Sequence, residues 1–274
     1  MAKKSSPRAP KPSLTAQELL DRARQHLQEN KLRQALTDLN KAIRLNPRFL
    51  DALNQRGMIY LAQGDLDRAF EDFDDAVHLD PNHVMSCNNR GIALMQMEEY
   101  EAALSDFEKA IKLDKSQGEL YFNRGTARAY LANLDGALAD FDESIRLKPD
   151  FAPAYSRRGD IHLLLGNLKD AISDFNETIR LAPQVTAGYL SRAEALRRQG
   201  DLKGALADYD AALRIEPEQP DILLDRARLL ERMGNYAGAI NDYGRFLAAS
   251  GARGPDALLI RRYMLHLRAR ARWG

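Results

Sequence analysis

The sequence predicts an all-α solenoid of seven helix-turn-helix repeats followed by a C-terminal capping helix. A block of 34 residues recurs seven times in register along the 274-residue chain. Each copy contains two stretches of apolar residues at helical spacing, and in each copy an arginine is followed sixteen residues later by an aspartate. A fixed period of this length is typical of solenoids, in which each unit buries its apolar face only against its neighbours.

Residues 1–13 are expected to form a disordered basic tail. They contain Lys3, Lys4, Arg8 and Lys11 among serines and prolines, and they lack the apolar segment that a secretion signal requires. Such a composition cannot bury enough apolar surface to offset the entropy of ordering the chain.

Residues 14–250 are expected to form the seven-repeat solenoid. In the second copy, numbered from Leu50 as position 1, apolar residues recur at helical spacing up to Leu61, and Gly64-Asp65 then interrupts the pattern. The pattern resumes at Leu66, and Pro81 follows where a residue without a backbone N–H cannot continue a helix. The first copy has Glu29-Asn30 instead of glycine at its turn, so its link between helices is expected to differ slightly.

Small and large residues alternate at fixed positions of the repeat, as close packing between two helices requires. Position 8 holds glycine or alanine and position 20 always holds alanine, at Ala23, Gly57, Gly91, Gly125, Gly159, Ala193, Ala227 and at Ala35, Ala69, Ala103, Ala137, Ala171, Ala205, Ala239. Position 24 is large: Leu39, Phe73, Phe107, Phe141, Phe175, Tyr209 and Tyr243.

The recurring arginine and aspartate occupy positions 7 and 23, one on each predicted helix. The pairs are Arg22/Asp38, Arg56/Asp72, Arg90/Asp106, Arg124/Asp140, Arg158/Asp174, Arg192/Asp208 and Arg226/Asp242. A functional site would break the repeat symmetry, whereas these pairs preserve it. We therefore expect each arginine to hydrogen-bond the aspartate of its own repeat as a structural strut, at a partly buried point.

These residues lie where the tetratricopeptide pattern places them, and residues 16 to about 250 resemble that family. The resemblance implies a right-handed superhelix whose first helices line a concave groove. It also implies a non-enzymatic protein-interaction scaffold or adaptor, with no cofactor and no small-molecule substrate.

Residues 251–274 are expected to form a basic capping helix over the seventh repeat. Asp256 is a plausible N-cap, and an apolar stripe follows, composed of Leu259, Ile260, Tyr263, Met264 and Leu267. The alternative is a helix that binds RNA or an anionic membrane surface.

Charge is segregated along the chain, although the net charge is only +1. The tail carries +4 and residues 251–274 carry +5, which leaves −8 on residues 14–250. The acidic middle segment argues against nucleic-acid binding as the main function. No segment is apolar enough to span a bilayer, and the single cysteine, Cys87, cannot form an internal disulfide, so we expect a cytoplasmic protein.

Candidate binding residues are the ones that differ between copies at positions 2, 5, 9, 12 and 13 of the first helix. The predicted groove residues are Asn54, Met58, Leu61, Asn88, Ile92, Met95, Gln96, Phe122, Tyr130, Leu163, Leu164, Arg197, Arg198, Arg228 and Arg232. Methionines suit an adaptable apolar surface, and asparagines can bind an extended backbone. The pattern predicts a peptide partner with apolar anchors and an acidic portion.

Two alternatives for this groove remain open at the level of sequence. The chain's own tail or a second copy could cover the apolar strip. An acidic body with basic ends would also allow head-to-tail self-assembly into a structural scaffold. No catalytic motif and no clustered metal ligands occur, because the five histidines are scattered over the chain.

Overall fold

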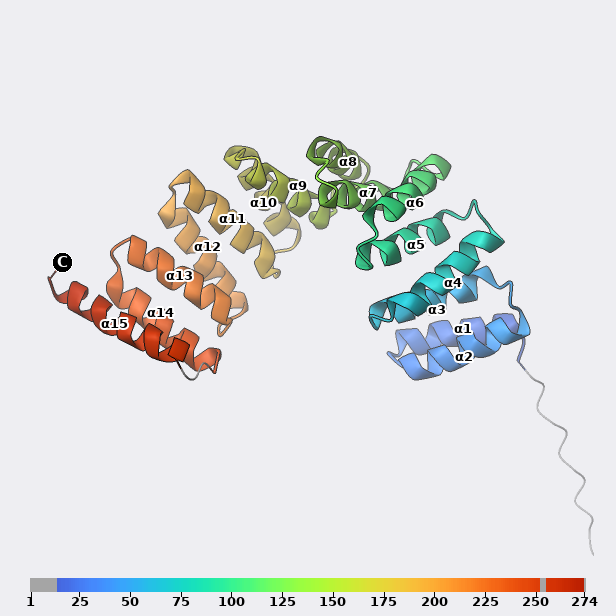
Figure 1. The fold of residues 1–274 in the computed structure, drawn as a ribbon, viewed down its shortest axis with the longest axis horizontal. Coiled ribbons are helices and arrows are strands. Elements are labelled where there is room, and N and C mark those ends of the chain that lie inside the picture. Colours follow the sequence, from blue (N-terminus) through green and yellow to red (C-terminus); the bar gives the residue numbers. More distant parts are fainter. Residues whose placement is uncertain (1–13, 252–254, 274) are drawn as a thin grey trace, which may run out of the picture. The chain divides into compact units, whose positions relative to one another are not determined.

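The computed structural model describes residues 14–251 and 255–273, with side chains described for residues 14–251 and 257–271. This part of the chain contains 15 helices and no strand (Figure 1). It divides into two compact units, and the boundary in the sequence lies between residues 133 and 134. The predicted tail, residues 1–13, lies outside the described residues. The helices of the first unit are α1 (Ala16–Gln28), α2 (Leu32–Leu45), α3 (Leu50–Ala62), α4 (Leu66–Leu79), α5 (Val84–Gln96), α6 (Tyr100–Leu113) and α7 (Gly118–Tyr130).

The second unit continues the same alternation of first and second helices. It comprises α8 (Leu134–Leu147), α9 (Ala152–Leu164), α10 (Leu168–Leu181), α11 (Thr186–Gln199), α12 (Leu202–Ile215), α13 (Pro220–Arg232), α14 (Tyr236–Ala249) and α15 (Pro255–Trp273). Within each unit, every helix packs against the helix that follows it in sequence. This arrangement confirms the predicted all-α fold of helix-turn-helix repeats.

The small and large repeat positions meet at the crossing of the two helices in a repeat. A Cβ atom added to Gly57 would lie 2.6 Å from the Phe73 ring, and one added to Gly91 would lie 2.6 Å from the Phe107 ring. Real Cβ atoms do not approach a ring so closely, so a phenylalanine of this placement requires glycine opposite it. Alanine is found opposite Leu39, Tyr209 and Tyr243, so the two positions vary together.

The turn inside each repeat depends on one residue in the left-handed backbone region. Position 15 has a φ of 57° at Asn30 and of 76° at Gly64, and all seven copies fall between 57° and 94°. Asparagine tolerates this region because its short polar side chain can bond locally. The predicted difference in the first link is therefore wrong, since Asn30 adopts the same conformation as the glycines.

The arginine and aspartate of a repeat form a bidentate ion pair in the six copies whose two partners lie within one unit. The N–O distances are 2.5 to 2.9 Å in the pairs Arg22/Asp38, Arg56/Asp72, Arg90/Asp106, Arg158/Asp174, Arg192/Asp208 and Arg226/Asp242. Arg124 belongs to the first unit and Asp140 to the second, so this pair stays a prediction.

Within each of these pairs the aspartate is more deeply buried than the arginine. The exposed fraction is 3% for Asp38, Asp72 and Asp208, 4% for Asp106 and Asp174, and 1% for Asp242. The arginine side chains are 17–24% exposed in five of the six pairs. Each pair as a whole is therefore partly buried, as expected, with a buried aspartate and a more exposed arginine. The physical reason is length, because a short aspartate side chain keeps its carboxylate close to the packed helices, whereas the longer arginine reaches it from the edge of the crossing.

Helix α15 packs on the end of the seventh repeat through one face, as predicted for a capping helix. Ala257 and Leu267 are buried, and Ile260 and Met264 contact the cluster around Tyr243. Leu259 is exposed, so its place in the predicted apolar stripe is wrong.

The start of α15 also differs from the sequence prediction. Helix α15 begins at Pro255, which makes Asp256 its second residue and not its N-cap. The fixed φ of proline suits the first helical position, where its missing N–H has no intrahelical partner to lose.

Candidate functional site

The face that the first helices of each unit present is the candidate binding surface, and we call it the first-helix face. In the first unit it is formed by α1, α3, α5 and α7, and in the second by α9, α11 and α13. Each unit therefore has its own first-helix face.

Asparagines of the first unit bond to one another across successive first helices. Asn54 Nδ2 donates to Ser86 Oγ at 2.8 Å and to the carbonyl of Leu50 at 3.1 Å, and Asn54 Oδ1 accepts from Asn89 Nδ2 at 3.2 Å. One repeat further on, Asn123 Nδ2 donates to Asn88 Oδ1 at 2.8 Å. Both asparagine pairs join residues that are 35 positions apart in the sequence. Asn88 is buried. Both polar atoms of Asn54 and the Oδ1 of Asn88 are thus bonded within the chain, and peptide binding by these two asparagines stays a prediction.

The predicted apolar groove residues of the first unit fall into two classes. Leu61, Ile92 and Met95 are half-buried and pack against the cores around Phe73 and Phe107. Phe122 is also half-buried, whereas Met58, Gln96 and Tyr130 are exposed. The Tyr130 ring stacks on Tyr100, with centroids 4.8 Å apart. An apolar ligand would therefore meet Met58 and Tyr130 before it met the half-buried residues.

A shallow cavity of about 320 Å³ surrounds Met58 on this face. Its apolar lining comes from Met58 and Met85, whose exposed fractions are 45% and 46%. Its polar lining is Arg24, Asp51, Asn54, Gln55, His83 and Asn89. Two flexible methionines in a concave polar frame form a surface that can adapt to one apolar side chain.

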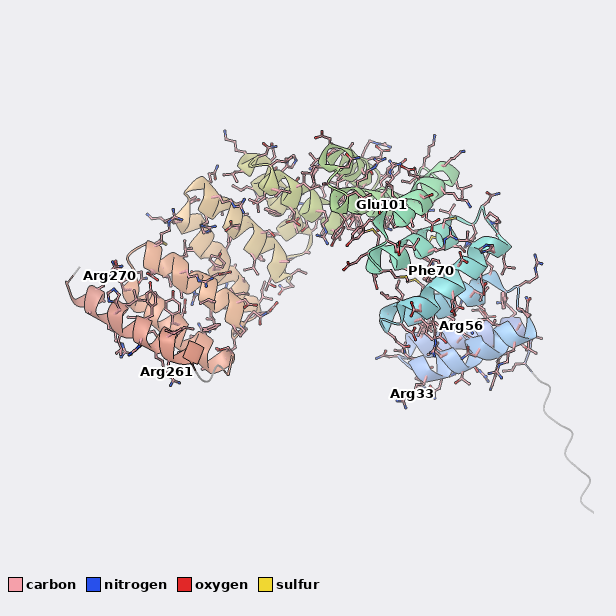
Figure 2. The ribbon with its side chains drawn as sticks, viewed as in Figure 1. Arg33, Arg56, Phe70, Glu101, Arg261 and Arg270 are labelled. Carbon is pink, nitrogen blue, oxygen red and sulfur yellow. The ribbon has the colours of Figure 1, made fainter. Side chains whose placement is uncertain are left out.

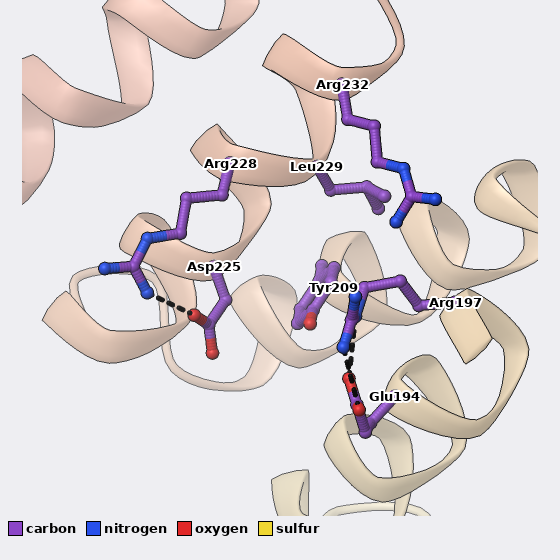
Figure 3. A pocket seen from close by; sticks show the side chains of 7 residues that line it. All are labelled: Glu194, Arg197, Tyr209, Asp225, Arg228, Leu229 and Arg232. Atoms are coloured by element: carbon purple, nitrogen blue, oxygen red, sulfur yellow. Dashed lines mark hydrogen bonds and ion pairs between the residues drawn. The ribbon is translucent and has the colours of Figure 1, made fainter.

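In the second unit, three of the four predicted arginines line a cavity of about 340 Å³ between α11, α12 and α13 (Figure 3). The cavity is lined by Glu194, Arg197, Tyr209, Asp225, Arg228, Leu229 and Arg232. Figure 3 shows ion pairs at two sides of the cavity, with Tyr209 and Leu229 between them. The predicted apolar residues of α9 lie outside this lining: Leu163 is half-buried and Leu164 is exposed.

Most of these arginines already have a carboxylate partner. Arg197 donates to both oxygens of Glu194, at 2.7 and 2.8 Å, and Arg198 Nε donates to the same carboxylate at 2.6 Å. Arg228 Nη1 lies 3.3 Å from Asp225 Oδ1. Among the residues described, Arg232 forms no ion pair and stays exposed. Three guanidinium groups and two carboxylates line the cavity, so its formal charge is +1.

The pKa values of two side chains in this cavity, Glu194 and Tyr209, are shifted in opposite directions. The hydrogen bonds from Arg197, with a smaller contribution from Arg198, lower the pKa of Glu194. Burial raises the pKa of the Tyr209 hydroxyl to about 12. At neutral pH Glu194 is therefore ionised and Tyr209 is a neutral hydrogen-bond donor beside the arginines.

Sequence reasoning did not select Tyr209, Met85 or His83 as binding residues. Tyr209 comes from a second helix, and its only signal is that position 24 changes from phenylalanine to tyrosine in the sixth repeat. Met85 occupies position 2, a groove position, but was not included in the predicted set. His83 precedes α5 and caps it by accepting from the Ser86 amide at 3.1 Å.

Metal binding and membrane spanning find no support in the part of the chain that the structure describes. No group of three or more histidine, cysteine, aspartate or glutamate side chains is arranged there to hold a metal ion. None of the described helices has the length and apolar character needed to traverse a bilayer. Cys87 is buried, and burial raises the pKa of its thiol.

Family models for the tetratricopeptide repeat match most of the chain. One model matches residues 20–84, 122–186 and 157–220, a second matches residues 84–117, and a third matches residues 192–264. A comparison with curated protein sequences found no match.

Solved structures with the same fold cover most of this chain. A tetratricopeptide repeat protein from Parabacteroides merdae has a TM-score of 0.66 at 20% identity, over 92% of this chain and 98% of that one. PilW, a type IV pilus biogenesis factor, has a TM-score of 0.71 at 21% identity, over 76% and 96%. YrrB, described as having an unusual peptide-binding site, has a TM-score of 0.53 at 23% identity, over 68% and 95%. At these identities the likeness concerns the fold alone.

Proposed function

Because this chain belongs to the tetratricopeptide repeat family, we propose that it is a non-enzymatic scaffold or adaptor that captures a partner peptide segment on its first-helix face. The family is in general a protein-interaction module. The observation that carries the proposal is the positively charged cavity of the second unit, in which Arg232 projects beside a neutral tyrosine and a leucine.

A carboxylate is the ligand chemistry that this cavity fits best. Arg232 offers donors that no carboxylate of the described residues uses, and the Tyr209 hydroxyl can add a neutral hydrogen bond. Leu229 supplies an apolar wall, and partial enclosure strengthens an ion pair relative to one in open water. An aspartate or glutamate side chain of a partner peptide satisfies all three features.

The cavity of the first unit fits an apolar side chain of the partner. Met58 and Met85 together expose apolar surface inside a concave site. An apolar side chain of a partner that bound there would remove this surface from water. A solved protein of the same fold is described as having a peptide-binding site, which supports this class of partner. Binding of such a segment typically falls in the micromolar range, about −8 kcal/mol.

Self-assembly is the second candidate function, and the charge distribution disfavours a direct contact between the two basic ends. A head-to-tail stack would bring α15, with exposed Arg261, Arg262 and Arg268, against the end formed by α1 and α2, which exposes Lys41 and Arg44. Like charges would face each other at that contact. A cytoplasmic location is part of the proposal, because a free buried cysteine suits a reducing compartment.

Peptide-display selection against the full chain tests the proposal. We expect selected peptides to combine an acidic residue with an apolar one. Reversing the charge of the cavity with Arg228→Glu and Arg232→Glu should weaken their binding by at least about tenfold, or about 1.4 kcal/mol. The control is Lys203→Glu with Arg214→Glu, which makes the same charge change at exposed positions of α12. Equal affinity for both double variants would reject the cavity as the binding site.

A further inference from the structure

In five repeats the arginine at position 7 makes a third hydrogen bond, to a residue of the preceding repeat. Its Nη1 donates to an aspartate or asparagine at position 25 of the preceding repeat, at 2.6 to 2.7 Å. The five observed pairs are Arg56 with Asn40, Arg90 with Asp74, Arg158 with Asp142, Arg192 with Asn176 and Arg226 with Asp210. Each guanidinium therefore joins its own repeat to the second helix of the repeat before it.

Arg22 lies in the first repeat, and the described residues contain no helix that precedes it. It keeps the bidentate pair with Asp38, at 2.6 Å for each bond, but makes no backward bond among the residues described. Its side chain is 42% exposed, against 17–24% for the five arginines that have the backward partner. The absence of a preceding helix from the described residues accounts for this doubled exposure.

The surface around Arg22 has both the apolar and the charged parts of a docking site. It is a concavity of about 370 Å³ lined by Leu14, Leu19, Arg22, Lys41, Arg44 and Leu45, at the end of the first unit that α1 and α2 form (Figure 1). Leu45 is 61% exposed. The lining contains three cations and no carboxylate. We call this surface the N-terminal end face.

We infer that the N-terminal end face docks an acidic amphipathic helix of a partner protein, which presents an aspartate or asparagine to Arg22 as the preceding repeat does elsewhere. The chain itself shows what covers the equivalent faces: α2, α4, α8, α10 and α12, each of which offers an oxygen of an Asx side chain. Arg22 is already paired with Asp38, so it is Lys41 and Arg44 of the lining that favour an acidic helix over a neutral one.

Charge argues against the chain's own tail and against a second copy that docks end to end. The chain's own residues 1–13 carry +4 and would be repelled by Arg22, Lys41 and Arg44. A second copy docking end to end would bring either its own basic end face or α15, on which Arg261 and Arg270 are exposed (Figure 2). An acidic helix from a different protein meets neither repulsion.

A peptide with the sequence of α4, residues 66–79, is a suitable probe because α4 fills the equivalent role toward Arg90 through Asp74. We expect the fluorescently labelled, helix-stapled peptide to bind the full chain in an anisotropy titration. An Asp74→Lys peptide should bind at least about tenfold more weakly, whereas an Asp74→Asn peptide should stay within about threefold, since asparagine fills the role in two repeats.

Variants of the protein locate the probe on the N-terminal end face. Lys41→Glu with Arg44→Glu leaves the Arg22 pair intact and should weaken the peptide at least about tenfold. Lys112→Glu with Lys115→Glu is the matched control, because Lys112 shares its repeat position with Arg44 and both lysines are exposed. The cavity variant Arg228→Glu/Arg232→Glu should also bind the probe normally, which separates this inference from the proposed function.

Four results would overturn the inference. The first is absence of peptide binding to the full chain, and the second is equal binding to the Lys41→Glu/Arg44→Glu variant and its control. The third is binding that appears only after deletion of residues 2–13, which would make the tail the occupant. The fourth is a dimer in sedimentation experiments that the Lys41→Glu/Arg44→Glu variant abolishes, which would make a second copy the occupant.

Discussion

Replacement of Arg90 by methionine should destabilise the protein much more than the same change at Arg22. Arg90 donates to both oxygens of Asp106, at 2.6 and 2.7 Å, and to Asp74 at 2.6 Å. Methionine keeps an unbranched side chain of similar length in the helix but removes all three bonds. The carboxylate of Asp106, whose side chain is 6% exposed, would then be buried without its cation.

The size of the effect follows from the number of bonds and the burial of the stranded group. Loss of one partner of a buried pair costs about 3–5 kcal/mol. Arg90 is 21% exposed, so water screens the pair in part and we expect about 3 kcal/mol. Arg22 has two bonds and twice the exposure, and the imidazole of His26 lies 3.6 Å from Asp38. For Arg22→Met we therefore expect about 1–2 kcal/mol.

Urea denaturation followed by circular dichroism measures both variants. The curves should be fitted with a nearest-neighbour repeat model, since repeats need not unfold in a single step. A second variant, Arg90→Met with Asp106→Leu, removes the stranded charge and should recover most of the loss. The reasoning fails if Arg90→Met and Arg22→Met cost the same, or if the double variant is less stable than Arg90→Met.

Two further predictions concern the buried tyrosines and the turns. Burial raises the pKa of Tyr209 and Tyr243 to about 12, so the stability that their protonated forms contribute is present below the unfolded value of 10.0 and is lost as pH rises through about 12. Ultraviolet titration of the native protein should show at least two tyrosines that ionise late, and ionisation of all tyrosines near the unfolded value would contradict this. Glu98 has a φ of 64°, so Glu98→Gly should raise stability by about 0.5–1 kcal/mol in urea denaturation while Glu98→Ala should not, and equal effects would exclude relief of backbone strain.

Most of the fold could be predicted from the sequence because every important packing contact recurs at a fixed spacing. Glycine at position 8 opposite phenylalanine at position 24, and arginine at position 7 followed by aspartate at position 23, each join two helices of one repeat. The Arg/Asp spacing recurs in all seven copies and the Gly/Phe spacing in four, so a pattern that would be ambiguous once becomes decisive. The start of α15 was not predictable in the same way, because that helix occurs once and has no repeat against which to compare it.

Much less of the candidate site could be predicted, because exposure depends on what neighbouring repeats place beside each residue. Asn54 and Asn88 occupy groove positions, yet asparagines 35 residues away engage them in a ladder. Arg197 and Arg198 are cations in the sequence, but Glu194 pairs with both. The near-complete burial of aspartates such as Asp174 and Asp242 likewise depends on how closely the helices around them pack.

By itself the sequence determined the repeat, its helices and the residues that pack inside it, because these depend on spacing within 34 residues. Only the tertiary structure decided which polar groups are already satisfied and which, such as Arg232 and the backward donor of Arg22, are available. The physical reason is that a hydrogen bond between repeats depends on distance and side-chain direction in space, and the order of residues along one chain does not record either.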